Sequence, residues 1–314
     1  MQAYLARRAA TFFVSLWVAV SAAYVALAAI PGDPAQFILG IDASPEALAA
    51  LRAQLGLDLS VGARYVQWFK GVLTGHFGHS VAYDISVGTL LWERMQVTLP
   101  LGFGALFVAA LVAVPGGVWA AAHAGRRQDA LISALSQVGL ATPTFWLGIW
   151  LMALFAVRLG WLPSGGFVAW SENPGQALAS LVLPALTLGL SRAAPLLRIV
   201  RAAVMDVLDQ DYVRTARAKG VPEGTVLWRH GLRCAIGSVA TALGLEATQL
   251  LAGSIVVESV FSLPGAGSLA LYAISSRDLP LIAGTVAFMA AGVLLVSLLV
   301  DIAYAMLDPR IRYG

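Results

Sequence analysis

Long apolar segments separated by shorter polar ones dominate the pattern of this 314-residue chain. A helix that crosses a bilayer needs about 20 mostly apolar residues. Six segments reach that length: residues 9–30, 98–122, 130–157, 178–200, 235–257 and 280–307. A soluble helical core would instead show charged residues along the outer face of each helix. The pattern therefore predicts an all-α polytopic membrane protein with six transmembrane helices.

The longest polar connection, residues 31–97, carries helical patterns of its own. The turn-forming Pro31–Pro34 cluster predicts the end of the first span. Residues 44–56 are typical of a short amphipathic helix, with Ser44 as its N-cap and Gly56 as its stop. Residues 61–75 predict a second helix, whose aromatic side chains suit a membrane interface. The connection is thus predicted to be a structured extracytoplasmic insertion between the first two spans.

Two further connections read as outer loops. Residues 158–178 are rich in Gly, Pro, Trp and Ser, which favours irregular structure. Residues 258–279 are similar, with a short helix expected after Gly267.

Composition agrees with a membrane protein. Hydrophobic residues make up 59% of the chain and charged residues 12%, whereas soluble domains are about 45–50% apolar. The single Cys234 permits no internal disulfide. His76 and His79 are flanked by glycines and lack a third ligand nearby, so no metal site is expected. No segment is typical of DNA or RNA binding, and no nucleic-acid partner is expected.

Basic residues predict the orientation, because cytoplasmic loops carry an excess of Lys and Arg. Of the 20 Lys and Arg residues, fourteen fall on the side that holds both termini: Arg7, Arg8, Arg126, Arg127, Arg192, Arg198, Arg201, Arg214, Arg217, Lys219, Arg229, Arg233, Arg310 and Arg312. Both termini are therefore predicted to be cytoplasmic. The first apolar run exceeds the usual 7–15 or so residues of a signal-peptide h-region, which favours a retained anchor.

The most unusual polar stretch is residues 211–233, which holds five Lys or Arg residues between two apolar segments. Ala216 and Gly220 are four residues apart, so a helix would place both on one face and leave a flat surface there. Pro222 would end this helix and could begin the next, over residues 222–233. One interpretation is a helix that another protein approaches closely. The other is a solvated basic loop that only follows the positive-inside rule.

The sequence YVRTARAKG, followed by WRHGLR, resembles the cytoplasmic loop of bacterial ABC-importer permeases, in particular the dipeptide/oligopeptide/nickel branch. The general signature is Glu-Ala-Ala, three residues, Gly, nine residues, then Ile-x-Leu-Pro. Arg214-Thr215-Ala216 occupy its first three places, Gly220 its Gly and Leu232 its Leu. Arg214 and Arg233 stand where the signature has its acid and its closing Pro.

Four more stretches are similar to the same branch and lie in the same order along the chain. They are IPGDPA (30–35), the segment 142–166 that begins TPTFWLG, the segment 256–284 that begins VVESVFS, and VDIAYAMLDPRIR (300–312). Together the five matches are spread along the chain from residue 30 to residue 312.

The resemblance implies a type I ABC-importer permease fold and an inner-membrane location in bacteria. It implies a coupling helix at Arg214, Thr215, Ala216, Arg217, Ala218, Lys219 and Gly220. The expected partners are a homologous second permease, in a heterodimer, two cytoplasmic ATPases, an extracytoplasmic substrate-binding protein and membrane lipid. The expected division is 1–94 (first helix and insertion), 95–307 (permease core with the coupling loop 203–234) and 308–314 (cytoplasmic tail).

No catalytic or cofactor-binding residue is expected in this chain. It lacks the Gly-x-x-x-x-Gly-Lys-Ser/Thr loop that cradles phosphates. If ATP and magnesium power transport, the partner ATPases must bind them. The protein is therefore expected to be a transport subunit rather than an enzyme.

Glu246 lies inside the fifth predicted span, where a carboxylate costs about 2.5–3.5 kcal/mol at mid-bilayer. Gln249 and Gly253 follow at i+3 and i+7 on one helical face. This stripe could line a translocation path, with Glu246 facing a cationic group such as a peptide amine. Alternatively, Glu246 is a structural acid that is protonated or paired with an arginine.

Two other classes of function are weighed against an importer of di- or oligopeptides or a related solute. A secondary transporter or channel driven by an ion gradient would need several intramembrane ionisable residues, and only Glu246 lies well inside a span. An intramembrane enzyme would need an acid–base pair, a metal triad or a Ser/His arrangement at membrane depth. The sequence does not indicate which solute is carried.

Overall fold

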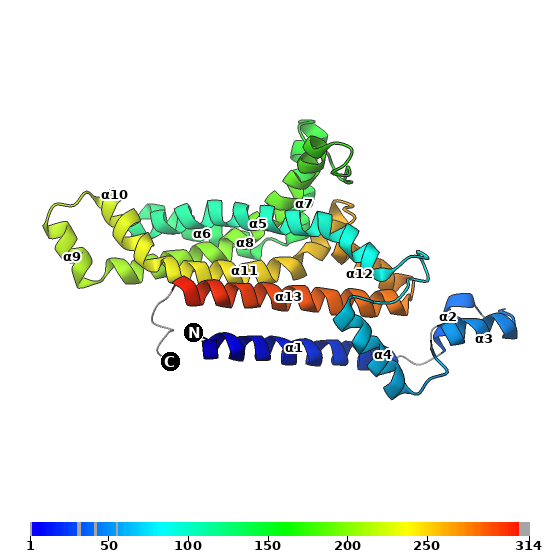
Figure 1. Ribbon diagram of the computed structural model, residues 1–314. Coiled ribbons are helices and arrows are strands. Elements are labelled where there is room, and N and C mark those ends of the chain that lie inside the picture. Colours follow the sequence, from blue (N-terminus) through cyan, green and yellow to red (C-terminus); the bar gives the residue numbers. More distant parts are fainter. Residues whose placement is uncertain (1, 30–32, 41–42, 55, 308–314) are drawn as a thin grey trace. The chain divides into compact units, whose positions relative to one another are not determined.

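The computed structural model describes residues 2–29, 33–40, 43–54 and 56–307, and these are almost entirely helical (Figure 1). The described helices are α1 (Gln2–Ala28), α2 (Pro34–Leu39), α3 (Pro45–Gln54), α4 (Val61–Thr74), α5 (Val87–Ala122), α6 (Arg127–Ala141), α7 (Thr144–Leu151), α8 (Pro174–Leu208), α9 (Asp211–Ala218), α10 (Glu223–Thr225), α11 (Arg233–Val260), α12 (Ala266–Ser275) and α13 (Leu279–Leu307). Two π-helical segments, η1 (Met152–Arg158) and η2 (Val226–Leu232), follow α7 and α10. The predicted turn at 31–32 and the tail at 308–314 lie outside the described residues.

Four helical stretches are long and apolar enough to cross a membrane, and two bent helix pairs could each form one more span. The four are Arg7–Ala28, Val87–Ala122, Pro174–Leu208 and Leu279–Ile302. The pairs run over residues 127–158 and 223–260. If each pair is one span, the described chain has the six spans that the sequence predicts.

The third span differs from the prediction of one continuous helix over 130–157. Its two parts, α6 and the segment from Thr144 to Arg158, meet at an angle of 101°. Pro143 explains the break, since it has no N–H to donate and disfavours helical backbone at the residue before it. Thr142 accordingly has extended angles, with φ −81° and ψ 120°.

The connection at 258–279 is more helical than predicted. Helix α11 continues to Val260, so Glu258 is a fully buried helical residue that accepts a hydrogen bond from the Thr98 hydroxyl at 2.8 Å. The expected short helix is α12, which begins one residue before Gly267. Only two short turns therefore remain irregular there.

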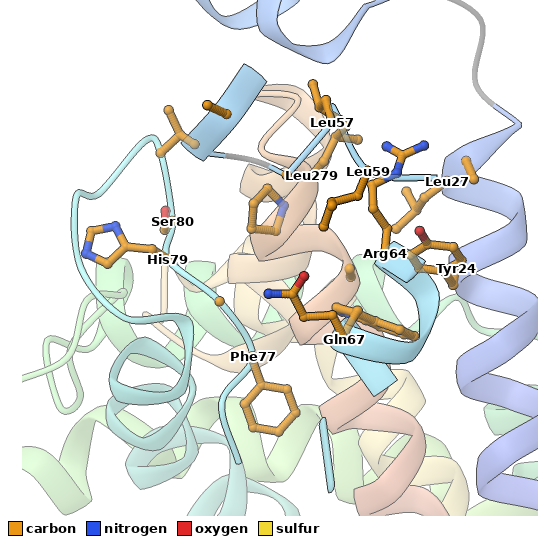
Figure 2. Close-up of a pocket in the computed structure, with 18 of the residues that line it drawn as sticks. Tyr24, Leu27, Leu57, Leu59, Arg64, Gln67, Phe77, His79, Ser80 and Leu279 are labelled. Atoms are coloured by element: carbon orange, nitrogen blue, oxygen red, sulfur yellow. The ribbon is translucent and has the colours of Figure 1, made fainter. Parts of the chain in front are cut away.

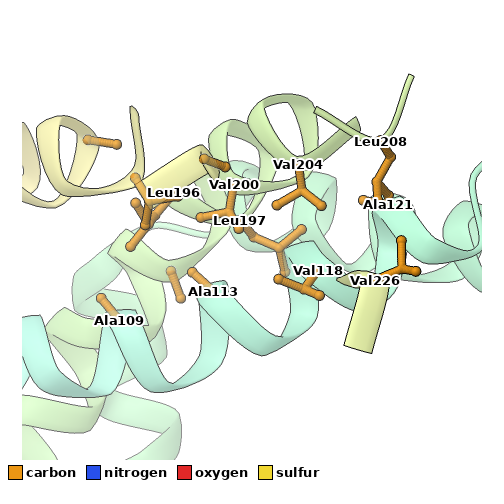
Figure 3. Close-up of a cluster of buried hydrophobic side chains, with 14 of the residues drawn as sticks. Ala109, Ala113, Val118, Ala121, Leu196, Leu197, Val200, Val204, Leu208 and Val226 are labelled. Carbon is orange, nitrogen blue, oxygen red and sulfur yellow. The ribbon is translucent and has the colours of Figure 1, made fainter. Parts of the chain in front are cut away.

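The described chain divides into two compact units, which we describe separately. Unit 1 holds residues 2–5, 98–263 and 296–307, and its core is built from α5, α8 and α11 with single residues of α9 and η2 (Figure 3). Helices α5 and α8 contribute most of its residues. Small residues let these two helices approach closely. A Cβ atom added at Gly189 would lie 2.6 Å from the Ala105 carbonyl oxygen, and one at Gly117 would lie 2.7 Å from Val200. The α5–α8 contact therefore depends on glycine at both positions.

Unit 2 holds residues 6–97 and 264–295. The buried Asp278 carboxylate organises it, accepting hydrogen bonds from the Ser80 hydroxyl (2.6 Å) and from the Ala82 N–H (3.0 Å). Its other oxygen accepts the Leu281 N–H at 3.0 Å, near the start of α13. One carboxylate thus joins the loop that follows α4 to the first turn of α13.

The insertion folds as the sequence predicts. Ser44 accepts the Ala47 N–H at 3.2 Å and caps α3, and Ser60 accepts the Ala63 N–H and caps α4. The side chains of Ser21 and Tyr65 join α1 to α4 with a 2.6 Å hydrogen bond.

Asp33 and Arg52 hold α2 and α3 together. The Arg52 Nε donates to Asp33 at 2.8 Å, and Asp33 also accepts the Ala35 N–H. The hydrogen bond from Arg52 lowers the pKa of Asp33 below its usual value. The Asp33–Arg52 pair therefore holds α2 and α3 together in addition to the short chain segment that connects them.

Candidate functional site

Helix α9 carries most of the predicted coupling segment and is fixed by a single buried side chain. Val213 is fully buried in the unit 1 core, where the cluster also includes Val204 and Leu208 of α8 and Val226 of η2. The remaining α9 side chains are exposed apart from Ala216, which is half-buried. The helix therefore presents a broad polar face with no covering from the described chain.

The C-terminal end of α9 corrects one detail of the sequence interpretation. Gly220 is not a helical residue beside Ala216; the helix ends at Ala218, and Gly220 has a left-handed φ of +76°. The Gly220 N–H bonds the Arg217 carbonyl (2.9 Å) and the Val221 N–H bonds the Ala216 carbonyl (3.2 Å). This pair of bonds is the Schellman motif, which glycine favours because it lacks a Cβ atom. Gly220 thus ends the helix and turns the chain.

An ion pair closes the turn after α9. Arg217 donates to the Glu223 carboxylate from Nη2 at 2.7 Å and from Nε at 3.2 Å. Pro222 is the N-cap of α10 rather than its first helical residue, and the helical path then continues through η2 into α11. Helix α9 is therefore held to α8 on one side and to the start of the fifth span on the other.

Gly220 gives a direct stability prediction. A side chain at Gly220 would meet no atom within 4 Å, so only the backbone conformation opposes a substitution. We expect Gly220→Ala to lower the free energy of unfolding by about 1 kcal/mol, since left-handed backbone costs an L-residue roughly 1–2 kcal/mol. Gly220→Asn should cost less, because asparagine tolerates this region. Thermal unfolding of the purified proteins should show the wild type as most stable, Gly220→Asn next and Gly220→Ala least stable. Equal stability of all three would contradict the prediction.

The predicted translocation stripe lies on α11, but its three members differ in environment. Glu246 is buried, with 7% of its surface exposed, whereas Gln249 is exposed. A Cβ atom added at Gly253 would lie 3.1 Å from the Arg192 guanidinium. Helix α8 therefore covers the stripe at Glu246 and Gly253, whereas Gln249 is left uncovered by the described chain.

Arg192, one of the fourteen basic residues on the predicted cytoplasmic side, lies beside Glu246 in the structure. Its Nη1 lies 3.8 Å from Glu246 Oε2, and that oxygen is buried without a hydrogen-bond partner in the described structure. Glu246 therefore faces an arginine of the same chain. The sequence signal for this pair was an arginine in the middle of an apolar segment, because charges at membrane depth usually pair.

A second ion pair was missed by the sequence analysis. Arg201 of α8 donates to Asp129 from Nε at 2.6 Å and from Nη2 at 2.7 Å. Asp129 also accepts the Gly125 N–H at 2.9 Å, so its carboxylate closes the turn that precedes α6. The pair joins α6 to α8 a few residues from the start of α9.

No group of three or more His, Cys, Asp or Glu side chains that could hold a metal occurs among the residues the structure describes. His76 Nδ1 lies 3.0 Å from the Thr74 hydroxyl, and His79 lies 3.9 Å from Asp84.

The family of the chain follows from two sequence matches. Residues 113–313 match the family described as "Binding-protein-dependent transport system inner membrane component". Residues 1–99 match the N-terminal region of such membrane components. The chain belongs to this family. As a binding-protein-dependent transport component, it is a multi-pass inner-membrane permease subunit of an ABC importer, and it is not an enzyme.

Named relatives align along the whole chain. A protein named as a peptide transport system permease from Brucella abortus (strain 2308) is 38% identical over 313 residues, which is 100% of each chain. A glutathione transport system permease protein from Salmonella typhimurium (strain LT2) is 37% identical over 310 residues, covering 99% of both. These similarities do not favour the ion-gradient transporter or channel.

The fold has a counterpart among solved structures. A chain of the MetNI methionine ABC transporter, in an inward-facing conformation, superposes with a TM-score of 0.60 at 18% identity. The match covers 70% of this chain and 96% of that one. The helical arrangement is therefore that of an ABC-importer permease. Family membership implies a second permease, ATPase partners and a binding protein for this permease.

Proposed function

We propose that this permease imports di- or oligopeptides or a closely related solute, with α9 and the turn at Gly220 as the site that engages an ATPase. The observation that carries the proposal is the α9 geometry: an exposed polar helix, fixed to the core by Val213 and locked by the Arg217–Glu223 pair. A helix attached in this way moves with α8 and η2 as one body. Movement of a bound ATPase would therefore reach the membrane helices.

Three features support the partners and orientation. The C-terminal half of α9 exposes the small Thr215 and Ala218 beside the basic Arg214 and Arg217, which permits close approach by an acidic or polar groove. The fourteen basic residues support a cytoplasmic location of α9 and both termini. The lack of a phosphate-binding loop in the sequence requires ATP to bind elsewhere. We propose a heterodimer with a sister permease, two cytoplasmic ATPases and an extracytoplasmic binding protein.

The chain is divided functionally at the second span. We assign residues 1–94 to an anchor helix with its extracytoplasmic insertion, residues 95–307 to the permease core, and residues 308–314 to a cytoplasmic tail. The helical insertion supports a separate first segment, and the proposed boundary at residue 94 lies within α5 (Val87–Ala122).

We place the translocation path beside α11. Exposed Gln249 is the member of the stripe that a solute reaches directly, while Glu246 and Gly253 lie behind it against Arg192. The peptide assignment is supported by the Brucella relative, which is named for peptide transport.

Transport by reconstituted protein tests this function. The permease is assembled in vesicles with its sister permease, ATPases and binding protein, and uptake of a radiolabelled dipeptide is measured with glutathione and nickel as competitors. We expect peptide accumulation that requires both ATP and the binding protein. Accumulation driven by an ion gradient without ATP would overturn the importer proposal. ATP-dependent uptake of a non-peptide alone would overturn only the choice of solute.

The path has a separate test that uses the single cysteine. In a Cys234→Ser background, we expect Gln249→Cys to react with a small water-soluble thiol reagent and to be protected by the transported peptide. The control is Ile236→Cys, because Ile236 is exposed and lies about 140° around the same helix from Gln249. Equal labelling of both positions, with no protection at either, would show that Gln249 does not line the path.

A further inference from the structure

Unit 2 contains a cavity of about 900 Å³ that no step of transport proposed above uses. Its walls come from the C-terminal end of α1, the connection between α3 and α4, α4 itself, the loop that follows it and the start of α13. Figure 2 shows Tyr24 and Leu27 on α1, with Arg64 and Gln67 projecting from the neighbouring α4. The volume is within the range of about 300–1,000 Å³ that holds small-molecule ligands.

The lining is mainly apolar and aromatic, with one cation that has no counter-charge. Leu27, Leu57, Leu59, Phe77 and Leu279 contribute hydrocarbon surface. Arg64 lines the same cavity, and no carboxylate of the described residues lies within ion-pair distance of its guanidinium. Asp58 and Asp84 also line the cavity, but both are exposed to solvent. The cavity therefore combines a long apolar wall with an unpaired positive charge.

Two buried donors beside the cavity lack acceptors. The Nε atoms of Arg64 and Trp68, one helical turn apart on α4, are buried and make no hydrogen bond within the described chain. A buried donor without an acceptor costs about 1–3 kcal/mol. The Arg64 side chain is flexible and can turn its guanidinium towards an acceptor that enters the cavity. A hydrogen bond formed there would remove the free-energy cost of the unpaired Arg64 donor.

The surroundings indicate where such an acceptor comes from. Helix α1 is an apolar membrane-spanning candidate, and the cavity lies at its C-terminal end. Tyr24, Tyr65 and Trp68 pack their rings together there, at centroid distances of 5.4 and 5.2 Å from Tyr24. Tyr and Trp rings gather at the level of lipid headgroups. The cavity is thus at the membrane surface, where phospholipid is the abundant molecule with an anion on an apolar chain.

We propose that this cavity binds one anionic phospholipid, with its phosphodiester at Arg64 and an acyl chain along Leu27, Leu57 and Leu59. Bound there, the lipid would join α1 to the insertion and to α13. The site would attach the insertion to the membrane surface independently of which solute is carried.

Native mass spectrometry of the full-length, delipidated protein tests the site. The probes are phosphatidylglycerol, diacylglycerol with the same chains and inorganic phosphate. We expect phosphatidylglycerol to bind, diacylglycerol to bind at least tenfold more weakly, and inorganic phosphate at equal concentration to displace nothing. Displacement by inorganic phosphate would identify a simple anion site and overturn the lipid proposal. Equal binding of diacylglycerol would show that Arg64 selects no phosphate and would also overturn it.

Matched variants separate this site from general lipid contact. Arg64→Gln should weaken phosphatidylglycerol binding at least tenfold, whereas Arg64→Lys should stay within about threefold of the wild type. Lys70→Gln is the control, because Lys70 is an exposed cation on the same helix outside the cavity lining. An Arg64→Gln protein that binds phosphatidylglycerol as tightly as the Lys70→Gln protein would refute the proposal. Lipid binding is measured here without transport, so its failure would leave the proposed function untouched.

Discussion

Replacing Ala218 with tryptophan should strongly reduce ATP-driven uptake while leaving the permease folded. Ala218 is the last residue of α9 and is exposed, so a larger side chain there extends away from the unit 1 core. In the proposed complex it would occupy the space of the ATPase groove. Interface positions at the centre of a contact typically change binding by 2 kcal/mol or more, so we expect a loss of about thirtyfold. Co-purification of the ATPases and peptide uptake are the two measurements.

The control is Ala124→Trp, which places the same side chain on an exposed residue in the turn between α5 and α6. We expect its uptake to stay within about twofold of the wild type. If Ala218→Trp retains both its ATPases and its uptake, α9 is a solvated loop helix and not the coupling site. If Ala218→Trp and Ala124→Trp lose uptake equally, a tryptophan on either exposed turn impairs transport, and the loss is not specific to α9.

The second large effect is expected at Arg201, whose removal leaves a buried carboxylate without its cation. The side chain of Asp129 is 8% exposed and that of Arg201 28%. Removing one partner of a buried pair costs about 3–5 kcal/mol. Because Arg201 is partly solvated, and Asp129 keeps its bond from Gly125, we expect Arg201→Met to lower the free energy of unfolding by roughly 3 kcal/mol. Denaturant unfolding of the purified protein in detergent measures it.

Arg198→Met is the matched control, since Arg198 lies one turn earlier on α8 and is exposed. It should change the unfolding free energy by less than about 0.5 kcal/mol, as surface substitutions usually do. The double variant Asp129→Asn with Arg201→Met should regain part of the loss, because no uncompensated charge remains. If Arg201→Met and Arg198→Met lower the free energy of unfolding equally, the Arg201–Asp129 pair makes no specific contribution to stability.

The sequence predicted the helices well because membrane spans and capped helices leave strong local signals. Four of the six apolar segments correspond to single helices long enough to span a membrane and the other two to bent helix pairs, and Ser44 caps α3 as expected. The break at Thr142 was missed, although Pro143 carried the signal, because the apolar run continues across it. Gly220 was assigned to a helical face from its spacing, whereas glycine at that place more often ends a helix.

The ion pairs could not be predicted in the same way. Arg192 meets Glu246 from a helix more than 50 positions away, and Arg201 meets Asp129 across a similar separation. Sequence shows that each charge needs a partner, but the choice of partner depends on how α6, α8 and α11 pack. The cavity beside Arg64 is likewise formed by segments from both ends of the chain.

Helix α8 connects three neighbouring helices along its length, and Pro184 and Pro195 lie within it. Its 35 residues span roughly 50 Å at 1.5 Å per residue. Only Asp209 and Gln210 separate its end from α9. Arg192 and Arg201 fasten it to α11 and α6 on the way. A tilt imposed at the α9 end would therefore reach α6 through Arg201 and α11 through Arg192, so one push at the loop is distributed over three membrane helices.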